Sequence, residues 1–181
     1  MLNLKLLAIA ACAALAACEQ KPVPLEKVMP PPPVKPAKPK NLLLSAGAVG
    51  PVTFGIPLAQ AEASLGQAMR LDEADNPECS FVSFKALPKV RFMVEKGLIT
   101  RADVEQEIAN THGIRVGDTV EQFRQKLPDA KTEPHEYVKG GHKFTVPGAG
   151  KAAMVMESDG KVITSVRAGL EPSVSYSEGC S

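Results

Sequence analysis

Histidines are the side chains best suited to bind a metal or move a proton near neutral pH, and this chain has three. Two of them, His135 and His142, flank Gly140-Gly141 and stand near Glu136 in "PHEYVKGGH". Zinc needs three or four ligands that converge in tight geometry. Polar residues on the surface of a hairpin are the simpler interpretation of this stretch. The sequence therefore predicts no metal and no cofactor.

Other side chains that could do chemistry lack a supporting motif. No serine stands in a nucleophile-elbow context, and neither Cys79 nor Cys180 has a histidine beside it in a recognisable nucleophile pattern. The stretch "VPGAGKAAM" lacks the Gly-x(4)-Gly-Lys-Ser/Thr spacing of a phosphate-binding loop. We therefore expect a protein that is not an enzyme.

Residues 1–17, "MLNLKLLAIAACAALAA", have the layout of an export signal: Lys5, a short apolar run and then small residues. The end of this segment, Leu15-Ala16-Ala17-Cys18, resembles a bacterial lipobox. The resemblance implies cleavage before Cys18, acylation of that cysteine with chains such as palmitate, and, because Glu19 follows it, retention at the periplasmic face of the outer membrane. An ordinary secretory signal cut near Ala17 is the alternative. A lipobox ending at Cys12 would leave too short an apolar run.

Removal of the signal leaves Cys18 for lipid and an even pair of cysteines, Cys79 and Cys180. In an oxidising compartment such a pair favours a disulfide. The bond would close a loop of about 100 residues, which the chain-entropy model credits with roughly 4 to 5 kcal/mol. We predict a Cys79–Cys180 disulfide that ties the end of the domain to its first half.

Composition separates a tether from a folded domain. Residues 18–44 hold eight of the 16 prolines and five lysines, so they favour polyproline II and form no core. At about 3.1 Å per residue, roughly 24 residues of this tether reach at most ~75 Å. The chain after the signal has 20 basic and 20 acidic side chains, a balance that argues against nucleic acid as a partner. Residues 45–181 are long enough for one domain.

The elements of this domain recur with an offset of 62 residues. "FGIPLAQAEASLG" and "VGDTVEQFRQKLP" share the apolar spacing of a short amphipathic helix, with Asp118 as the expected N-cap of the second helix. Downstream, "VRFMVEKGLITRADV" and "AAMVMESDGKVITSVRA" each alternate as two strands around a glycine turn. "CSFVSFKAL" and "HKFTVPG" predict a further strand in each copy.

These patterns predict an α+β fold made of two tandem helix-plus-three-strand repeats, about residues 52–104 and 114–168, with a tail at residues 169–181. The two repeats are expected to form one antiparallel sheet, or two abutting sheets, with both helices on one face. The helix start, the three-stranded meander with a glycine turn and the lipobox together resemble the small outer-membrane assembly lipoproteins of the SmpA/OmlA type. Their fold is shared with the tandem-repeat β-lactamase-inhibitor proteins. The resemblance implies protein binding in the envelope, and no catalysis.

Alternation places a set of side chains on the sheet face away from the helices, where a partner would bind. Tyrosines join this set because they are favoured at protein interfaces. The candidate binding residues are Arg91, Met93, Glu95, Tyr137, Val155, Glu157 and Tyr176. The sequence thus predicts an outer-membrane lipoprotein that binds another envelope protein, as an assembly factor or an inhibitor. The alternative is a carbohydrate- or peptidoglycan-binding lipoprotein, against which the absence of Trp counts.

Overall fold

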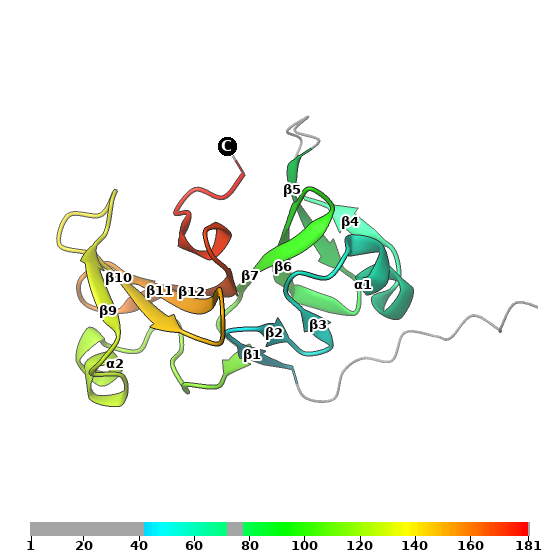
Figure 1. Cartoon of the computed structure of the whole chain (residues 1–181). Coiled ribbons are helices and arrows are strands. Elements are labelled where there is room, and N and C mark those ends of the chain that lie inside the picture. The colour runs from blue at the N-terminus through cyan, green and yellow to red at the C-terminus, as the bar shows by residue number, and fades with distance from the viewer. Residues whose placement is uncertain (1–41, 72–77, 181) are drawn as a thin grey trace, which may run out of the picture. The chain divides into compact units, whose positions relative to one another are not determined.

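The computed structural model describes residues 42–71 and 78–180, which belong to one unit of the chain, Lys35–Ser181. The predicted signal, Cys18 and most of the predicted tether lie outside the described residues. Within the described part, no helix is long and apolar enough to span a membrane. Figure 1 shows the arrangement of the elements.

A large antiparallel sheet forms the centre of the fold, with strand order β4-β5-β6-β7-β12-β11-β10-β9. Its strands are β4 (Ala68–Arg70), β5 (Cys79–Phe84), β6 (Leu87–Glu95), β7 (Leu98–Val104), β9 (Lys131–Pro134), β10 (His142–Pro147), β11 (Ala152–Ser158) and β12 (Ile163–Leu170). The two predicted hairpins are present: β6 and β7 join through Lys96-Gly97, and β11 and β12 join around Asp159-Gly160.

Two short helices and a small sheet cover one face of the large sheet, here called the inner face (Figure 1). The helices are α1 (Leu58–Leu65) and α2 (Val120–Lys126), and the small sheet has the order β3-β2-β1-β8. Its strands are β1 (Leu43–Ser45), β2 (Ala48–Val49), β3 (Val52–Thr53) and β8 (Ala109–Asn110). The β1–β8 pair is parallel, so the small sheet is mixed.

One apolar core joins these layers. Ala61 and Leu65 of α1 and Phe123 of α2 are buried in the same cluster as the inner-face side chains of the strands. The rings of Phe123 and Phe144 stack with centroids 4.2 Å apart, which fixes α2 against β10. Before each helix, the backbone hydrogen-bonds to the start of β7 or of β12.

The predicted fold class, two tandem helix-plus-three-strand repeats in an α+β domain, is wrong. The described chain is mostly β, with one continuous eight-stranded sheet, a second mixed sheet and two helices of eight and seven residues. The prediction omitted β4 and β9 at the edges and all four strands of the small sheet. These strands have two to four residues each, too few to show a period of two.

The start of α2 also differs from the prediction. Thr119 is the N-cap, not Asp118: its hydroxyl accepts from the backbone of Gln122, and the Gln122 side chain accepts from Thr119 N. Two backbone donors at the helix start are therefore satisfied reciprocally. Asp118 instead accepts from the backbone of Arg115, which shapes the turn before the helix.

Gly169 lets β12 approach β7 closely at the middle of the large sheet. A Cβ at this position would lie 2.4 Å from the Thr100 carbonyl oxygen and 2.8 Å from Arg101 Cα, both backbone atoms that cannot rotate away. We expect Gly169→Ala to lower the free energy of unfolding by about 1 to 3 kcal/mol or more, because the two central strands must separate. Urea unfolding measures the change.

Gly47 provides the matched control for this substitution. A Cβ there meets no atom within 4 Å, so Gly47→Ala should change the stability by about 0.5 kcal/mol or less. Equal effects of the two substitutions would contradict the role assigned to Gly169.

Candidate functional site

The face of the large sheet opposite the helices, here called the outer face, carries a band of charged side chains. The strand registers pair Arg91 with Asp103, Asp103 with Arg167, and Arg167 with Val155 across β6, β7, β12 and β11. Directly opposite residues point to the same face of a sheet. The predicted alternation therefore does place Arg91 and Val155 on one face.

This face is not open, because residues 171–180, here called the covering segment, lie across it. The segment follows β12 and contains a 3-10 helix, η1 (Ser173–Ser175), which lies over the middle of the sheet (Figure 1). Val174 is fully buried in a small apolar cluster with Ala153 and Val155. Burying a valine side chain contributes about 1.5 to 3 kcal/mol. The covering segment thus occupies the surface that the sequence assigned to a partner.

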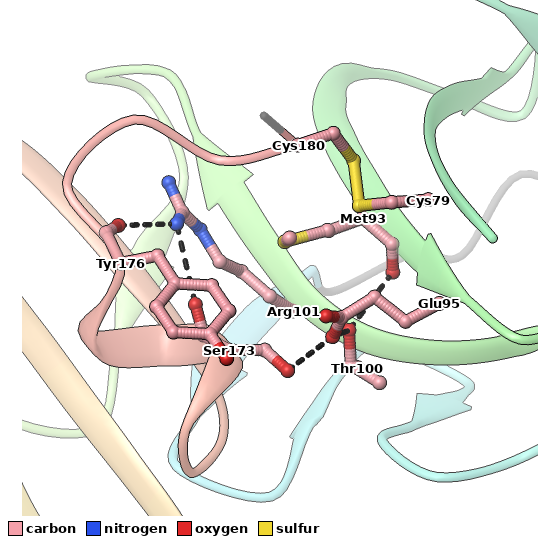
Figure 2. The surroundings of a disulfide bond; sticks show 8 residues. All are labelled: Cys79, Met93, Glu95, Thr100, Arg101, Ser173, Tyr176 and Cys180. Atoms are coloured by element: carbon pink, nitrogen blue, oxygen red, sulfur yellow. Dashed lines mark hydrogen bonds between the residues drawn. A yellow bond between two sulfur atoms is a disulfide. The ribbon is translucent and has the colours of Figure 1, made fainter. Parts of the chain in front are cut away.

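The side chain of Arg101, on β7, holds the covering segment by hydrogen bonds to the backbone of that segment (Figure 2). Its Nη1 donates to the carbonyl oxygens of Tyr176, at 2.6 Å, and Ser173, at 3.3 Å. Its Nε and Nη2 donate to Asp103 Oδ1 at 3.0 and 2.8 Å. Arg101 is only 3% exposed, and this burial lowers the pKa of the guanidinium, while Asp103 opposes that effect. The buried cation thus has both a counter-ion and main-chain acceptors.

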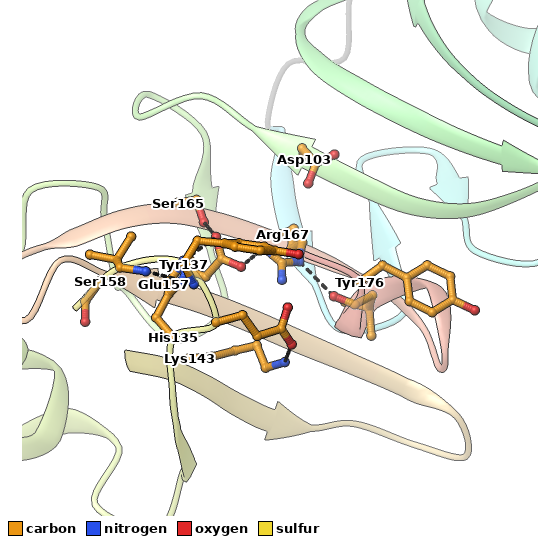
Figure 3. A network of polar contacts seen from close by, with 12 residues as sticks. Asp103, His135, Tyr137, Lys143, Glu157, Ser158, Ser165, Arg167 and Tyr176 are labelled. Atoms are coloured by element: carbon orange, nitrogen blue, oxygen red, sulfur yellow. Dashed lines mark hydrogen bonds and ion pairs between the residues drawn. The ribbon is translucent and has the colours of Figure 1, made fainter. Parts of the chain in front are cut away.

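Arg167 of β12 makes a parallel set of contacts (Figure 3). Its Nε donates to the Val174 carbonyl oxygen at 2.7 Å, and its Nη1 lies 2.7 Å from Glu157 Oε1. Ser165 donates to Glu157 Oε2 at 2.9 Å. Burial raises the pKa of Glu157, but the Arg167 charge and these hydrogen bonds outweigh it, so the pKa is lowered overall. Glu157 is therefore ionised at neutral pH.

The far end of the covering segment is fixed by the disulfide Cys79–Cys180, with the two Cα atoms 5.5 Å apart. The predicted pairing is confirmed. Near the start of the segment, the Ser173 hydroxyl donates to Glu95, which also accepts from Thr100 at 2.7 Å (Figure 2). The segment is thus held at both ends and in the middle.

A pocket of about 450 Å³ opens beside the covering segment and brings several predicted residues together. Tyr137, from the loop between β9 and β10, lines this pocket together with Tyr176 and donates to Glu178 Oε1 at 2.5 Å. This hydrogen bond raises the pKa of the Tyr137 phenol. The lining residues are Cys79, Met93, Glu95, Glu136, Tyr137, Ser175, Tyr176, Ser177, Glu178, Gly179 and Cys180.

The predicted binding residues therefore fall into separate environments. Met93 and Val155 are buried, so neither can contact a partner while the covering segment is in place. Arg91 lies away from the pocket, with its guanidinium 4.3 Å from the centre of the Phe81 ring and 3.7 Å from Asp103. The side chain of Glu157 is nearly buried in its ion pair with Arg167.

Of the predicted binding residues, only Tyr137 and Tyr176 are well exposed in the pocket, at 64% and 41%. The two tyrosines are therefore the predicted residues best placed to contact a partner at this site.

The sequence reasoning missed Arg101, Asp103 and Arg167, the residues on which this face depends. The signal was present: in "ITRADV" and "SVRAGL", strict alternation puts Arg101 and Asp103 on one face of β7 and aligns them with Arg167. Charged residues directly opposite each other in a sheet predict pairing. The hydrogen bonds to the covering segment had no sequence signal, because their acceptors are main-chain carbonyls.

The side chains of His135, Glu136 and His142 do not converge on a common point as metal ligands would. His135 Nε2 lies 3.7 Å from Glu157, and its Nδ1 accepts from the backbone of Tyr137 and Val138, which makes it part of the local turn. His142 stacks on Phe144. Among residues 42–71 and 78–180, no three His, Cys, Asp or Glu side chains come together as a metal site would require.

Comparisons with known proteins add little. No family model matches the chain, and the search of curated proteins found no match. Among solved structures, the chain is similar to part of an extracellular protein containing a SCP domain from Bacillus anthracis str. Ames, at 14% identity and a TM-score of 0.45. That match covers 65% of this chain and 44% of the other, so the chain spans less than half of that protein. A similarity this weak carries no argument about fold or function.

Replacing Glu157 by Gln should cost about 1 to 3 kcal/mol near neutral pH, because Arg167 loses its counter-ion. The folded-state pKa of Glu157 lies below its ordinary value of 4.5. Its contribution is therefore complete above about pH 4.5 and is lost as the pH falls through the lower folded-state pKa. Urea unfolding between about pH 3 and pH 7 should show a steeper acid loss of stability in the wild type than in E157Q.

Glu133→Gln is the control for this comparison. Glu133 lies on the edge strand β9 and pairs with Lys131, a partly exposed ion pair of the kind that contributes little. If E133Q reduced the loss of stability at low pH as much as E157Q does, the Glu157–Arg167 ion pair would not be the source of that loss.

Proposed function

We propose that this protein is a non-enzymatic lipoprotein, anchored at the periplasmic face of the outer membrane, that binds another envelope protein through the tyrosine-lined pocket. The observation that carries the proposal is the convergence of Tyr137 and Tyr176, from distant parts of the chain, on one open pocket. Tyrosine supplies a large apolar surface with a polar end, which is why it is enriched at protein interfaces.

The polar residues that line the pocket indicate which partner surface would bind there. Three carboxylates line it: Glu95, Glu136 and Glu178. Glu136 pairs with Lys143 at 3.4 Å and accepts from Ser177, and these contacts lower its pKa. The lining is thus acidic, and it complements a partner surface that presents Lys or Arg beside an apolar contact.

The proposed location rests on the N-terminal sequence, with one point of support from the fold. The lipobox-like stretch ending at Cys18 and the proline-rich residues 18–44 are features of a tethered envelope protein. The disulfide Cys79–Cys180 agrees with an oxidising compartment.

A carbohydrate- or peptidoglycan-binding role is the second candidate, because tyrosine rings and carboxylates in one pocket also suit sugar hydroxyls. Its discriminating test is binding of the protein to purified peptidoglycan and to a glycan array. Retention that is abolished in a Tyr137→Ala/Tyr176→Ala variant would favour this candidate over a protein partner.

Photo-crosslinking tests the protein-binding proposal. A photoreactive amino acid at position 176 should yield a discrete protein adduct in cells of the source organism, and the same residue at position 43 should not. Tyr176 and Leu43 are similarly exposed, at 41% and 46%, but Leu43 lies on the small sheet away from the pocket. Adducts at both positions, or at neither, would contradict binding through the pocket.

Cell fractionation tests the proposed anchor. Cys18→Ala should move the protein from the membrane fraction to the soluble fraction, because several acyl chains are needed for firm membrane attachment. Cys12→Ala removes the other cysteine of the signal region and should leave the protein in the membrane. Membrane retention of the Cys18→Ala variant would contradict the lipoprotein proposal.

A further inference from the structure

We propose that the covering segment is a redox-released cover: reduction of Cys79–Cys180 by a dithiol frees residues 171–180 from the outer face and exposes a peptide-binding surface built on Arg101 and Arg167. This proposal rests on contacts within the chain and not on the proposed function, although release of the segment would also carry Tyr176 and Glu178 away from the tyrosine-lined pocket.

The disulfide is placed where a reductant can approach it. Cys79 and Cys180 are both partly exposed, and both line the open pocket of about 450 Å³ (Figure 2). A disulfide inside the apolar core would require unfolding before attack. Here the approach leads through the pocket, past Glu178 and Tyr176.

The dithiol supplies both electrons that reduction of the disulfide requires. One thiolate of the dithiol attacks one sulfur of the Cys79–Cys180 bond and expels the other sulfur as a thiolate. The second thiolate of the dithiol then displaces the remaining cysteine. Two electrons and two protons pass to the cysteines, which end as thiols, and the reductant ends as a disulfide.

Loss of this bond removes the covalent link between Cys180 of the covering segment and Cys79 of β5. The segment continues directly from β12 at its start, so with the disulfide intact it is a short loop fixed at both ends. Once this crosslink is broken, the loop is no longer closed, and chain entropy favours departure of the segment. What remains are non-covalent contacts: the burial of Val174, the three arginine-to-carbonyl hydrogen bonds, and the bonds of Glu171 N to Lys151 O, Ser173 to Glu95, Ser177 to Glu136 and Tyr137 to Glu178.

The contacts of the covering segment define what the exposed surface would bind. Arg101 (Figure 2) and Arg167 (Figure 3) donate to main-chain carbonyls, a contact that any peptide can offer. Selectivity comes from the small apolar site of Ala153 and Val155 that holds Val174. The surface therefore fits a peptide segment with a small branched aliphatic side chain and free carbonyl groups.

The charges of the outer face argue against an anionic ligand. Three arginines, Arg91, Arg101 and Arg167, share this face with three carboxylates, Glu95, Asp103 and Glu157. Asp103 and Glu157 already neutralise Arg101 and Arg167. A phosphate or carboxylate ligand would be repelled by these carboxylates, whereas a neutral carbonyl is not.

Amide hydrogen exchange on the full chain, with and without dithiothreitol, tests the release. Exchange at residues 173–179 should speed up at least tenfold on reduction, while the amides of the β6–β7 and β11–β12 hairpins keep their protection. Unchanged exchange in the segment would overturn the proposal, since the other contacts alone would then hold it. Loss of protection throughout the domain would also overturn it, because the disulfide would then stabilise the whole fold.

A synthetic peptide tests the exposed surface. The probe is a fluorescent peptide of residues 171–180 with Cys180→Ser, and its control carries Val174→Asp in addition. The probe should bind the reduced protein at least tenfold more tightly than the oxidised protein, measured by fluorescence anisotropy, and the control peptide should not bind. Equal binding to both redox forms, or equal binding of both peptides, would contradict a surface that the covering segment normally fills.

Discussion

Two arginines buried on one face of a sheet impose the constraint on which this structure depends. A cation out of contact with water must be paired and hydrogen-bonded, and removal of one partner from such a pair is strongly destabilising. Arg101 and Arg167 obtain carboxylates from within the sheet and carbonyl oxygens from residues 171–180. The covering segment is therefore not a passive tail, because its main-chain oxygens complete the hydrogen bonding of both arginines while it lies on the sheet.

This pairing also shapes the remaining surface. The covering segment buries the middle of the outer face. The exposed candidate binding residues therefore lie at its margin, where the covering segment, the β9–β10 loop and the end of β6 line one pocket. The tyrosines occupy that margin, and the disulfide forms part of the same wall. One short segment thus completes the packing of the sheet and builds the pocket through which we propose that a partner binds.

Prediction from the sequence succeeded where local patterns were strong. The β6–β7 and β11–β12 hairpins follow from alternation around glycine turns, and the Cys79–Cys180 bond follows from an even cysteine count. The overall fold class was wrong because strands of two to four residues carry no detectable period. The prediction of an open binding face was wrong because its cover, "EPSVSYSEGC", has little hydrophobicity of its own. Its docking depends on hydrogen bonds that its main-chain carbonyls accept from Arg101, about 70 residues earlier, and from Arg167, seven residues before Val174.

The strand order has a consequence for how the chain reaches this state. β12 is the last strand in the sequence, yet it lies in the middle of the large sheet, between β7 and β11. Until residues 163–170 have left the ribosome, one side of β7 is an unpaired edge. An edge of that kind can pair with the same strand of a second nascent chain. Pairing of β12 with β7 in one chain thus competes kinetically with association of two incomplete chains.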